Sequence, residues 1–172
     1  MTTEFMILGL PRSGTTWAAN WLTTGQTTCL HDPLYQTHYE DLDKIVSTKR
    51  LGVSCTGLYN FTSWVNKHPA RKVVLHRDLA EINKSLENLG LPGVTQVDID
   101  KLWLIEGVHV AWSEIFTNPK PIYEFLTQLP FDKERHDLLK SFQIQPNLCD
   151  FNFDKEVTKR LMMELIQVSK EI

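Results

Sequence analysis

Short apolar runs, each bounded by polar or glycine-containing segments, recur along the first two thirds of the chain. Residues 5–9 and 72–76 form the two strongest runs, and residues 51–55 and 107–112 form two weaker ones. Apolar runs of about four to eight residues between turn signals are typical of buried parallel strands. The pattern therefore predicts strands at these four places, with residues 5–8 at the centre of the sheet.

Helical patterns alternate with these runs. Residues 15–24 have the pattern of a helix that Gly25 ends. Asp78, with Glu81 three residues later, has the spacing of a capping box and predicts a second helix that ends near Gly90. From Pro119 onward two further sets of apolar residues recur at helical spacing, and each is expected to pack in the core. These are Ile122, Phe125, Leu126 and Leu129, and then Val157, Leu161, Leu165 and Val168.

Strands that alternate with helices predict an α/β fold in which helices cover both faces of a parallel sheet. We expect a three-layer fold of the P-loop type, with a central sheet of about four or five strands. The length of 172 residues fits one domain over residues 1–172. Residues 90–98 and 143–154 are expected to be surface loops.

Composition excludes several classes of function. The formal net charge of −3 argues against a protein that coats nucleic acid, because such proteins are usually basic. Cys29, Cys55 and Cys149 are scattered and form no C-x-x-C pair, so we expect reduced thiols and no zinc site. The N-terminus lacks the basic region of a secretory signal, and the apolar run at residues 5–10 is too short to span a membrane. A cytoplasmic protein that binds neither nucleic acid nor membranes is expected.

The segment between the first strand and the first helix carries the strongest chemical signal. Residues 9–17 are Gly-Leu-Pro-Arg-Ser-Gly-Thr-Thr-Trp. Gly9 and Gly14 allow backbone N–H groups to face a phosphate, and the start of the helix adds positive potential. The standard nucleoside triphosphate loop has Lys directly after its second glycine. Here Thr15 holds that position and the positive charge lies at Arg12, so the loop predicts a phosphate site of a different type.

The run Pro-Arg-Ser-Gly-Thr-Thr-Trp resembles the 5′-phosphosulfate loop of the sulfotransferase family. The resemblance implies that the donor is 3′-phosphoadenosine-5′-phosphosulfate and that the loop cation contacts its phosphosulfate. It also implies that the next four residues cradle the 5′-phosphate and that the tryptophan stacks on the adenine. The implied binding residues are Pro11, Arg12, Ser13, Gly14, Thr15, Thr16 and Trp17. The competing interpretation is a simple strand-to-helix turn with Trp17 in the core.

A second motif supports this resemblance. Arg77 directly follows a predicted strand, and Ser85 lies eight residues later. Sulfotransferases resemble one another in this spacing, which implies that Arg77 and Ser85 bind the 3′-phosphate of the donor. About two helical turns separate Asp78 from Ser85, so Ser85 lies above the start of the helix. An arginine fork can hold a phosphate with two hydrogen bonds. The alternative is that Arg77 pairs with a carboxylate and Ser85 is solvated.

The chain departs from the larger cytosolic sulfotransferases in two respects. It lacks their late basic, glycine-rich segment, and residues 53–57 contain no histidine where those enzymes carry a catalytic one. His31 and Asp32 follow the first helix and are the candidates for the group that takes the hydroxyl proton of the acceptor. Arg12 would supply positive charge to the departing sulfuryl group. The alternative for His31 and Asp32 is an Asp-Pro turn with a solvated imidazole.

These observations predict a sulfotransferase-like enzyme that acts on a hydroxyl of a small acceptor and uses no metal. Two alternatives stay open. A P-loop kinase of a small metabolite would need ATP and magnesium, with Asp78 as a metal-holding acid, and the missing lysine after Gly14 counts against it. A non-catalytic nucleotide-binding protein would keep the fold without an acceptor site. The acceptor and the oligomeric state are open at this point.

Overall fold

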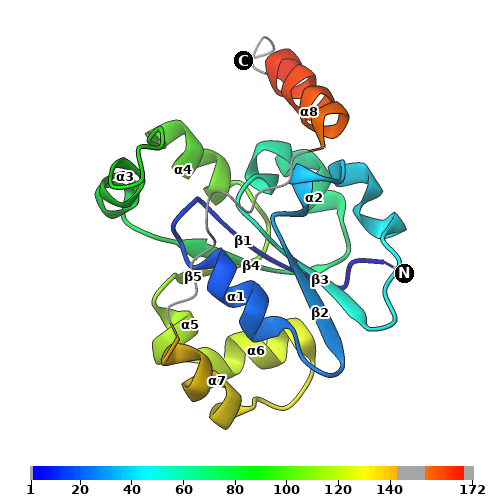
Figure 1. Ribbon diagram of the computed structural model, residues 1–172, viewed down its shortest axis with the longest axis vertical. Coiled ribbons are helices and arrows are strands. Elements are labelled where there is room, and N and C mark those ends of the chain that lie inside the picture. Colours follow the sequence, from blue (N-terminus) through cyan, green and yellow to red (C-terminus); the bar gives the residue numbers. More distant parts are fainter. Residues whose placement is uncertain (1, 143–153, 169–172) are drawn as a thin grey trace.

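The computed structural model has five parallel strands in one central sheet, in the order β2-β3-β1-β4-β5 (Figure 1). The structure describes residues 2–142 and 154–168. The strands are β1 (Phe5–Gly9), β2 (Thr27–His31), β3 (Arg50–Cys55), β4 (Arg71–His76) and β5 (Val108–Ala111). The predicted α/β class with a parallel sheet is confirmed, and β1 lies in its centre.

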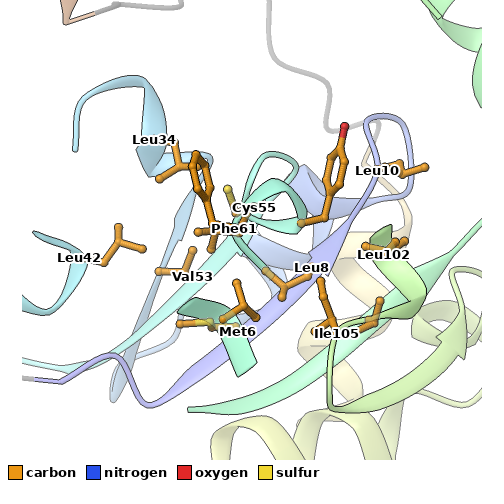
Figure 2. Packing of buried hydrophobic residues seen from close by; sticks show 14 of the residues in the cluster. Met6, Leu8, Leu10, Leu34, Leu42, Val53, Cys55, Phe61, Leu102 and Ile105 are labelled. Atoms are coloured by element: carbon orange, nitrogen blue, oxygen red, sulfur yellow. The ribbon is translucent and has the colours of Figure 1, made fainter. Parts of the chain in front are cut away.

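The side chains of β1 alternate between two separate apolar cores. Phe5 and Ile7 face one core, whereas Met6 and Leu8 face the other. Figure 2 shows Met6 and Leu8 packed in the second of these cores together with Val53. Because helices cover both faces of the sheet, all five residues of β1 are buried. This double burial explains why β1 is a continuous apolar run instead of an alternating one.

Helices form the two outer layers (Figure 1). One face is covered by α1 (Thr15–Leu22), α5 (Glu114–Thr117), α6 (Pro119–Thr127) and α7 (Lys133–Lys140). The other is covered by α2 (Thr62–Lys67), α3 (Leu79–Glu87), α4 (Gln96–Trp103) and α8 (Lys155–Val168). Two short 3₁₀ helices, η1 (Pro33–Tyr35) and η2 (Tyr39–Lys44), lie between β2 and β3, and a third, η3 (Leu58–Phe61), leads from β3 into α2. No helix in the described part of the chain has the length and apolar character needed to cross a membrane.

The predicted helix signals are largely confirmed. Asp78 caps α3, because its carboxylate accepts a hydrogen bond of 3.0 Å from the backbone N–H of Glu81. Gly90 has φ 67° just beyond α3, in the left-handed region that favours glycine. In α6, Ile122 and Leu126 are buried, but Phe125 is exposed, so its predicted core position is wrong.

The predicted face of α8 also packs against the core. Leu161 is buried, and Val157 and Leu165 are partly buried beside it. The side chain of Val168 lies outside the part that the structure describes.

Of the two predicted loops, one is shorter than predicted and the other lies almost entirely outside the described residues. The loop predicted at residues 90–98 ends early, because α4 begins at Gln96 behind a capping box formed by Thr95 and Asp98. The loop predicted at residues 143–154 lies outside the described residues except for Asp154, as does Cys149.

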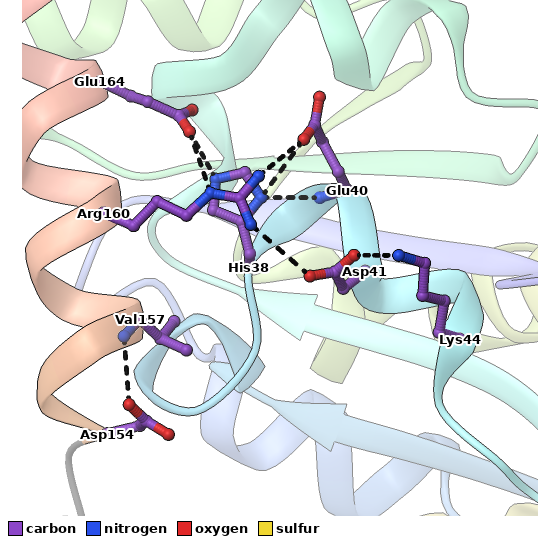
Figure 3. Close-up of polar contacts among 8 residues, drawn as sticks. All are labelled: His38, Glu40, Asp41, Lys44, Asp154, Val157, Arg160 and Glu164. Atoms are coloured by element: carbon purple, nitrogen blue, oxygen red, sulfur yellow. Dashed lines mark hydrogen bonds and ion pairs between the residues drawn. The ribbon is translucent and has the colours of Figure 1, made fainter.

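Helix α8 is fixed to the segment that follows β2 by a set of polar contacts (Figure 3). His38 is 2% exposed, and its Nε2 lies 2.8 Å from Oε1 of Glu164. Arg160 donates a hydrogen bond of 3.0 Å to Glu40. At the start of α8, the backbone N–H of Asp154 donates to the carbonyl oxygen of Tyr35, at 2.9 Å. These contacts place α8 beside η1 and η2.

Candidate functional site

The loop between β1 and α1 has an unusual backbone. Arg12 has φ 68° and Gly14 has φ 83°, so two of its residues lie in the left-handed region. Gly14 tolerates this conformation, and a Cβ atom there would lie 3.1 Å from Cδ1 of Ile115. The loop lies where β1 ends and α1 begins, which is the place at which open α/β sheets bind ligands and helix N-termini bind anions.

Arg12 joins this loop to α3 and to the end of β4. Its Nε donates a hydrogen bond of 2.8 Å to Oγ of Ser85, and its carbonyl oxygen accepts a hydrogen bond from Nη1 of Arg77. Nε of Arg77 also donates to Glu81, at 3.0 Å. We call Arg12, Arg77, Glu81 and Ser85 the cationic cluster. The structure thus brings together the two motifs that the sequence singled out, although the competing pairing of Arg77 with a carboxylate is present as well.

Trp112, which sequence reasoning did not assign to the site, lies against this cluster. The guanidinium carbon of Arg77 lies 4.3 Å from the centre of its indole ring, within the range of a cation–π contact. The backbone N–H of Trp112 donates to the carbonyl oxygen of His76, at 2.8 Å. The available signal was its place at the end of a predicted strand, at the same edge of the sheet as Arg77.

His31 and Asp32 form a second cluster at this edge of the sheet. The Oδ1 atom of Asp32 accepts hydrogen bonds from the backbone N–H and from Oγ1 of Thr56, the latter at 3.0 Å. Its Oδ2 atom lies 3.2 Å from Nε2 of His31, and the same nitrogen lies 3.1 Å from Oγ1 of Thr16. We call Thr16, His31, Asp32 and Thr56 the carboxylate cluster. Sequence reasoning missed Thr56.

The carboxylate of this cluster is buried and affects its neighbours. Asp32 is 6% exposed and has φ 43°. Burial, followed by the charge of Asp32, raises the pKa of Tyr35 to about 12. The same two causes raise the pKa of the Cys55 thiol well above its usual range. The Asp-Pro turn of the alternative is present, because Asp32 directly precedes the 3₁₀ helix that begins at Pro33, but the imidazole of His31 is only 22% exposed and Asp32 is enclosed by protein.

The remaining predicted loop residues lie partly inside the protein. Ser13 is fully buried, and its Oγ has no hydrogen-bond partner in the described part of the chain. Thr15 is buried, and its carbonyl oxygen accepts a hydrogen bond of 2.7 Å from Oγ of Ser54. Pro11 is half-buried at the start of the loop.

Trp17 lies in the core and not at the rim of the loop. It is 7% exposed, and its ring centre lies 4.7 Å from that of Phe116 and 5.4 Å from that of His136. Its Nε1 donates to the carbonyl oxygen of Leu139, at 3.3 Å. This is the placement that the competing interpretation expected, and adenine stacking by Trp17 stays a prediction.

A pair of histidines lies next to the cationic cluster. Nε2 of His76 lies 2.7 Å from Nδ1 of His109, and the ring of Trp103 stacks on His76 with ring centres 3.8 Å apart. Burial, and then the neighbouring His109, lowers the pKa of His76 to about 4. Among the described residues, no group of three or more His, Cys, Asp and Glu side chains is arranged to hold a metal ion.

No protein-family model, curated protein or solved structure matches this chain. The sulfotransferase resemblance therefore rests on residues 11–17 and on the spacing of Arg77 and Ser85.

Proposed function

We propose that this chain is a sulfotransferase-like enzyme that transfers a sulfuryl group from 3′-phosphoadenosine-5′-phosphosulfate to a hydroxyl of a small acceptor. One observation carries the proposal. Arg12 contacts both Arg77 and Ser85, which are 65 and 73 residues away in the sequence. This contact joins the two motifs of the resemblance at the edge of the sheet where ligands bind.

The charges of the cationic cluster support a ligand with several anionic groups. Nη1 of Arg77 donates to the backbone carbonyl of Arg12 in the loop that precedes α1, and Nε of Arg12 donates to Ser85. Two cationic side chains therefore belong to the segment before a helix whose N-terminal N–H groups also attract anions. Glu81, the carboxylate that contacts Arg77, is 56% exposed, and an exposed ion pair of this kind is weak enough for a phosphate to replace it.

The buried hydroxyl of Ser13 also fits an oxygen-rich ligand. Buried polar groups in proteins are nearly always hydrogen-bonded, and an unsatisfied one costs about 1–3 kcal/mol. Ser13 Oγ has no such partner in the described part of the chain. Its place in the loop, between the two left-handed residues Arg12 and Gly14, supports a role in holding a phosphate oxygen.

The proposed chemistry needs a base and a fixed positive charge. Sulfuryl transfer requires a base to take the acceptor proton while the acceptor oxygen bonds to sulfur. The bond between sulfur and the 5′-phosphate oxygen then breaks, and that oxygen keeps the electron pair. Arg12 would stabilise the negative charge that develops on the sulfuryl and bridging oxygens. His31 and Asp32 are the candidates for the base.

A thermal-shift comparison tests the proposal. We expect 3′,5′-phosphoadenosine, without magnesium, to stabilise the protein by about 2.7 kcal/mol at a hundredfold excess over Kd. For a chain of this length that corresponds to a rise in Tm of roughly 5–10 °C. Arg77→Ala should remove most of the rise, whereas Lys84→Ala, which removes an exposed cation on α3, should keep it.

Two outcomes would overturn the proposal. Stronger stabilisation by ATP with magnesium than by 3′,5′-phosphoadenosine would favour a kinase. Binding of 3′,5′-phosphoadenosine without transfer to any alcohol or phenol in a broad panel would favour a non-catalytic binding protein.

A further inference from the structure

We infer that His31 is the proton acceptor of this reaction, through Nδ1, and that Asp32 and Thr56 are positioning residues that fix its imidazole. The inference rests on the proposed function. It assigns different roles to His31 and Asp32, which the sequence left as alternatives for the base. It also assigns a role to Thr56, which no sequence motif indicated.

Asp32 is poorly placed to take a proton from a substrate. Its Oδ1 already accepts two hydrogen bonds from Thr56, and its Oδ2 lies against His31. Its backbone is held as well, since its N–H donates to the carbonyl oxygen of Ser54, at 2.8 Å. A residue kept buried at φ 43° by such contacts has the character of a fixed support. Asp32 therefore orients a neighbour, and that neighbour is His31.

The contact with Asp32 selects one tautomer of His31. An ionised carboxylate only accepts hydrogen bonds, so the nitrogen that faces it carries the proton. Nε2 of His31 faces Oδ2 of Asp32, which leaves the lone pair on Nδ1. In the described part of the chain Nδ1 of His31 has no hydrogen-bond partner, and the side chain is 22% exposed. Nδ1 is thus the nitrogen that an acceptor hydroxyl can reach.

Thr56 explains why the imidazole is fixed. In the sheet, His31 pairs with Ser54, so Thr56 lies two residues farther along, directly after the end of β3, where its backbone N–H and Oγ1 reach Oδ1 of Asp32. Nε2 of His31 also lies 3.1 Å from Oγ1 of Thr16, in the first turn of α1 and next to the proposed donor loop. The imidazole thus contacts Thr16 and Asp32 through Nε2, and Thr56 holds Asp32 in place, which is the kind of fixed geometry that a base beside the transferred group requires.

In the proposed step the proton moves to His31 and the sulfuryl group moves to the acceptor. Nδ1 of His31 takes the proton of the acceptor hydroxyl, and the acceptor oxygen forms a bond to sulfur. The bond from sulfur to the 5′-phosphate oxygen breaks, and the electron pair leaves with 3′,5′-phosphoadenosine. His31 is then doubly protonated, with Asp32 stabilising the imidazolium, and it returns its proton to solvent.

Asp32→Asn gives the sharpest test. The two donors of Thr56 would hold the amide oxygen, which turns the amide NH₂ toward His31. Nε2 would then have to accept, and the proton would move to Nδ1. We expect long-range ¹H–¹⁵N spectra of the ligand-free protein to show the Nε2–H tautomer of His31 in the unmodified chain and the Nδ1–H tautomer in Asp32→Asn. The His31 signals are assigned by their loss in His31→Gln.

Turnover provides the second measurement. Asp32→Asn and His31→Gln should each lower kcat by about 10²–10⁴-fold with little change in the affinity for 3′,5′-phosphoadenosine. Thr56→Val, which keeps the backbone donor, should lower kcat about tenfold. Thr28→Val, a half-buried threonine on the same strand as His31, is the matched control and should change neither kcat nor the tautomer.

The outcomes separate the two proposals. If transfer occurs but His31 holds its proton on Nδ1, or Asp32→Asn keeps full turnover, the assignment of His31 is wrong and the proposed function stands. If the chain binds no 3′,5′-phosphoadenosine and transfers no sulfuryl group, both fail, whatever tautomer the spectra show.

Discussion

The cationic cluster and the carboxylate cluster lie at the same edge of the sheet, but their carboxylates differ in burial, because the side chain of Glu81 is 56% exposed and Asp32 is 6% exposed. Arg77 and Glu81 meet through long side chains that reach solvent. Asp32 is enclosed and is held by a backbone N–H, a hydroxyl and an imidazole. Exposed charges rearrange easily around an incoming anion, whereas a buried hydrogen-bonded carboxylate stays where the fold puts it. The first arrangement suits binding, and the second suits the alignment of a base.

Arg12→Ala should give the largest effect on the cationic side. Loss of one preorganised charge of this kind raises the barrier by about 3–4 kcal/mol, so kcat should fall a hundredfold to a thousandfold. Tm should change little, because a loop cation contributes mainly to ligand and transition-state contacts. Arg50→Ala is the matched control, since Arg50 pairs with Glu4 at the opposite edge of the sheet. A loss in kcat of less than tenfold would show that Arg12 does not serve the chemistry.

Gly14→Ala should lower the stability of the fold and disturb the donor loop without affecting the carboxylate cluster. Alanine at φ 83° costs about 1–2 kcal/mol, and its Cβ atom would press on Ile115. Donor affinity should fall with it, while the tautomer of His31 should stay unchanged. Gly25→Ala, at a position with no atom within 4 Å of the added Cβ, is the control for urea unfolding. Equal loss of stability in both variants would contradict the strain at Gly14.

The lowered pKa of His76, next to the cationic cluster, predicts that the free energy of unfolding depends on pH. Its folded pKa of about 4 lies below the ordinary value of 6.5, so the unfolded chain binds the proton more readily between these values. The free energy of unfolding should therefore hold its full His76 contribution above about pH 6.5 and lose it as the pH falls toward 4. Because the ring is half-exposed, we expect a loss of only about 1 kcal/mol. In His76→Gln the free energy of unfolding, measured with urea, should change less between pH 6.5 and 4 than in the unmodified chain. An unchanged pH dependence in this variant would refute the assignment.

Glu81→Gln should give the smallest effect and the opposite sign. Removal of a carboxylate that competes for Arg77 should tighten the binding of 3′,5′-phosphoadenosine about two- to fivefold, the equivalent of an exposed ion pair. Isothermal titration calorimetry at low and high salt checks this, because the gain should shrink as salt screens the pair. Weaker binding in Glu81→Gln would mean that Glu81 orients Arg77 for its ligand.

The sequence predicted the parts of this molecule that depend on local pattern. β1 was evident from its apolar run, and Arg12, Arg77 and Ser85 were singled out by the resemblance of their two motifs to the sulfotransferase family. β2 was missed because Thr-Thr-Cys-Leu-His at an edge position has little apolar character, although its two β-branched threonines were an available signal. The role of Thr56 depends on the pairing of β2 with β3, and no local pattern contains that register. The burial of Trp17 depends on α5 and α7, which follow it by about a hundred residues along the chain.

The order of the strands has a consequence for translation. β1 pairs with β3 and β4, so its sheet neighbours leave the ribosome only after about 50 and 70 further residues have been made. At roughly 5–20 residues per second, Arg12 waits about 3–13 s for Arg77, its contact 65 residues later. During that interval the nascent chain carries an apolar strand that its sheet neighbours do not yet cover, and such a strand is prone to aggregate.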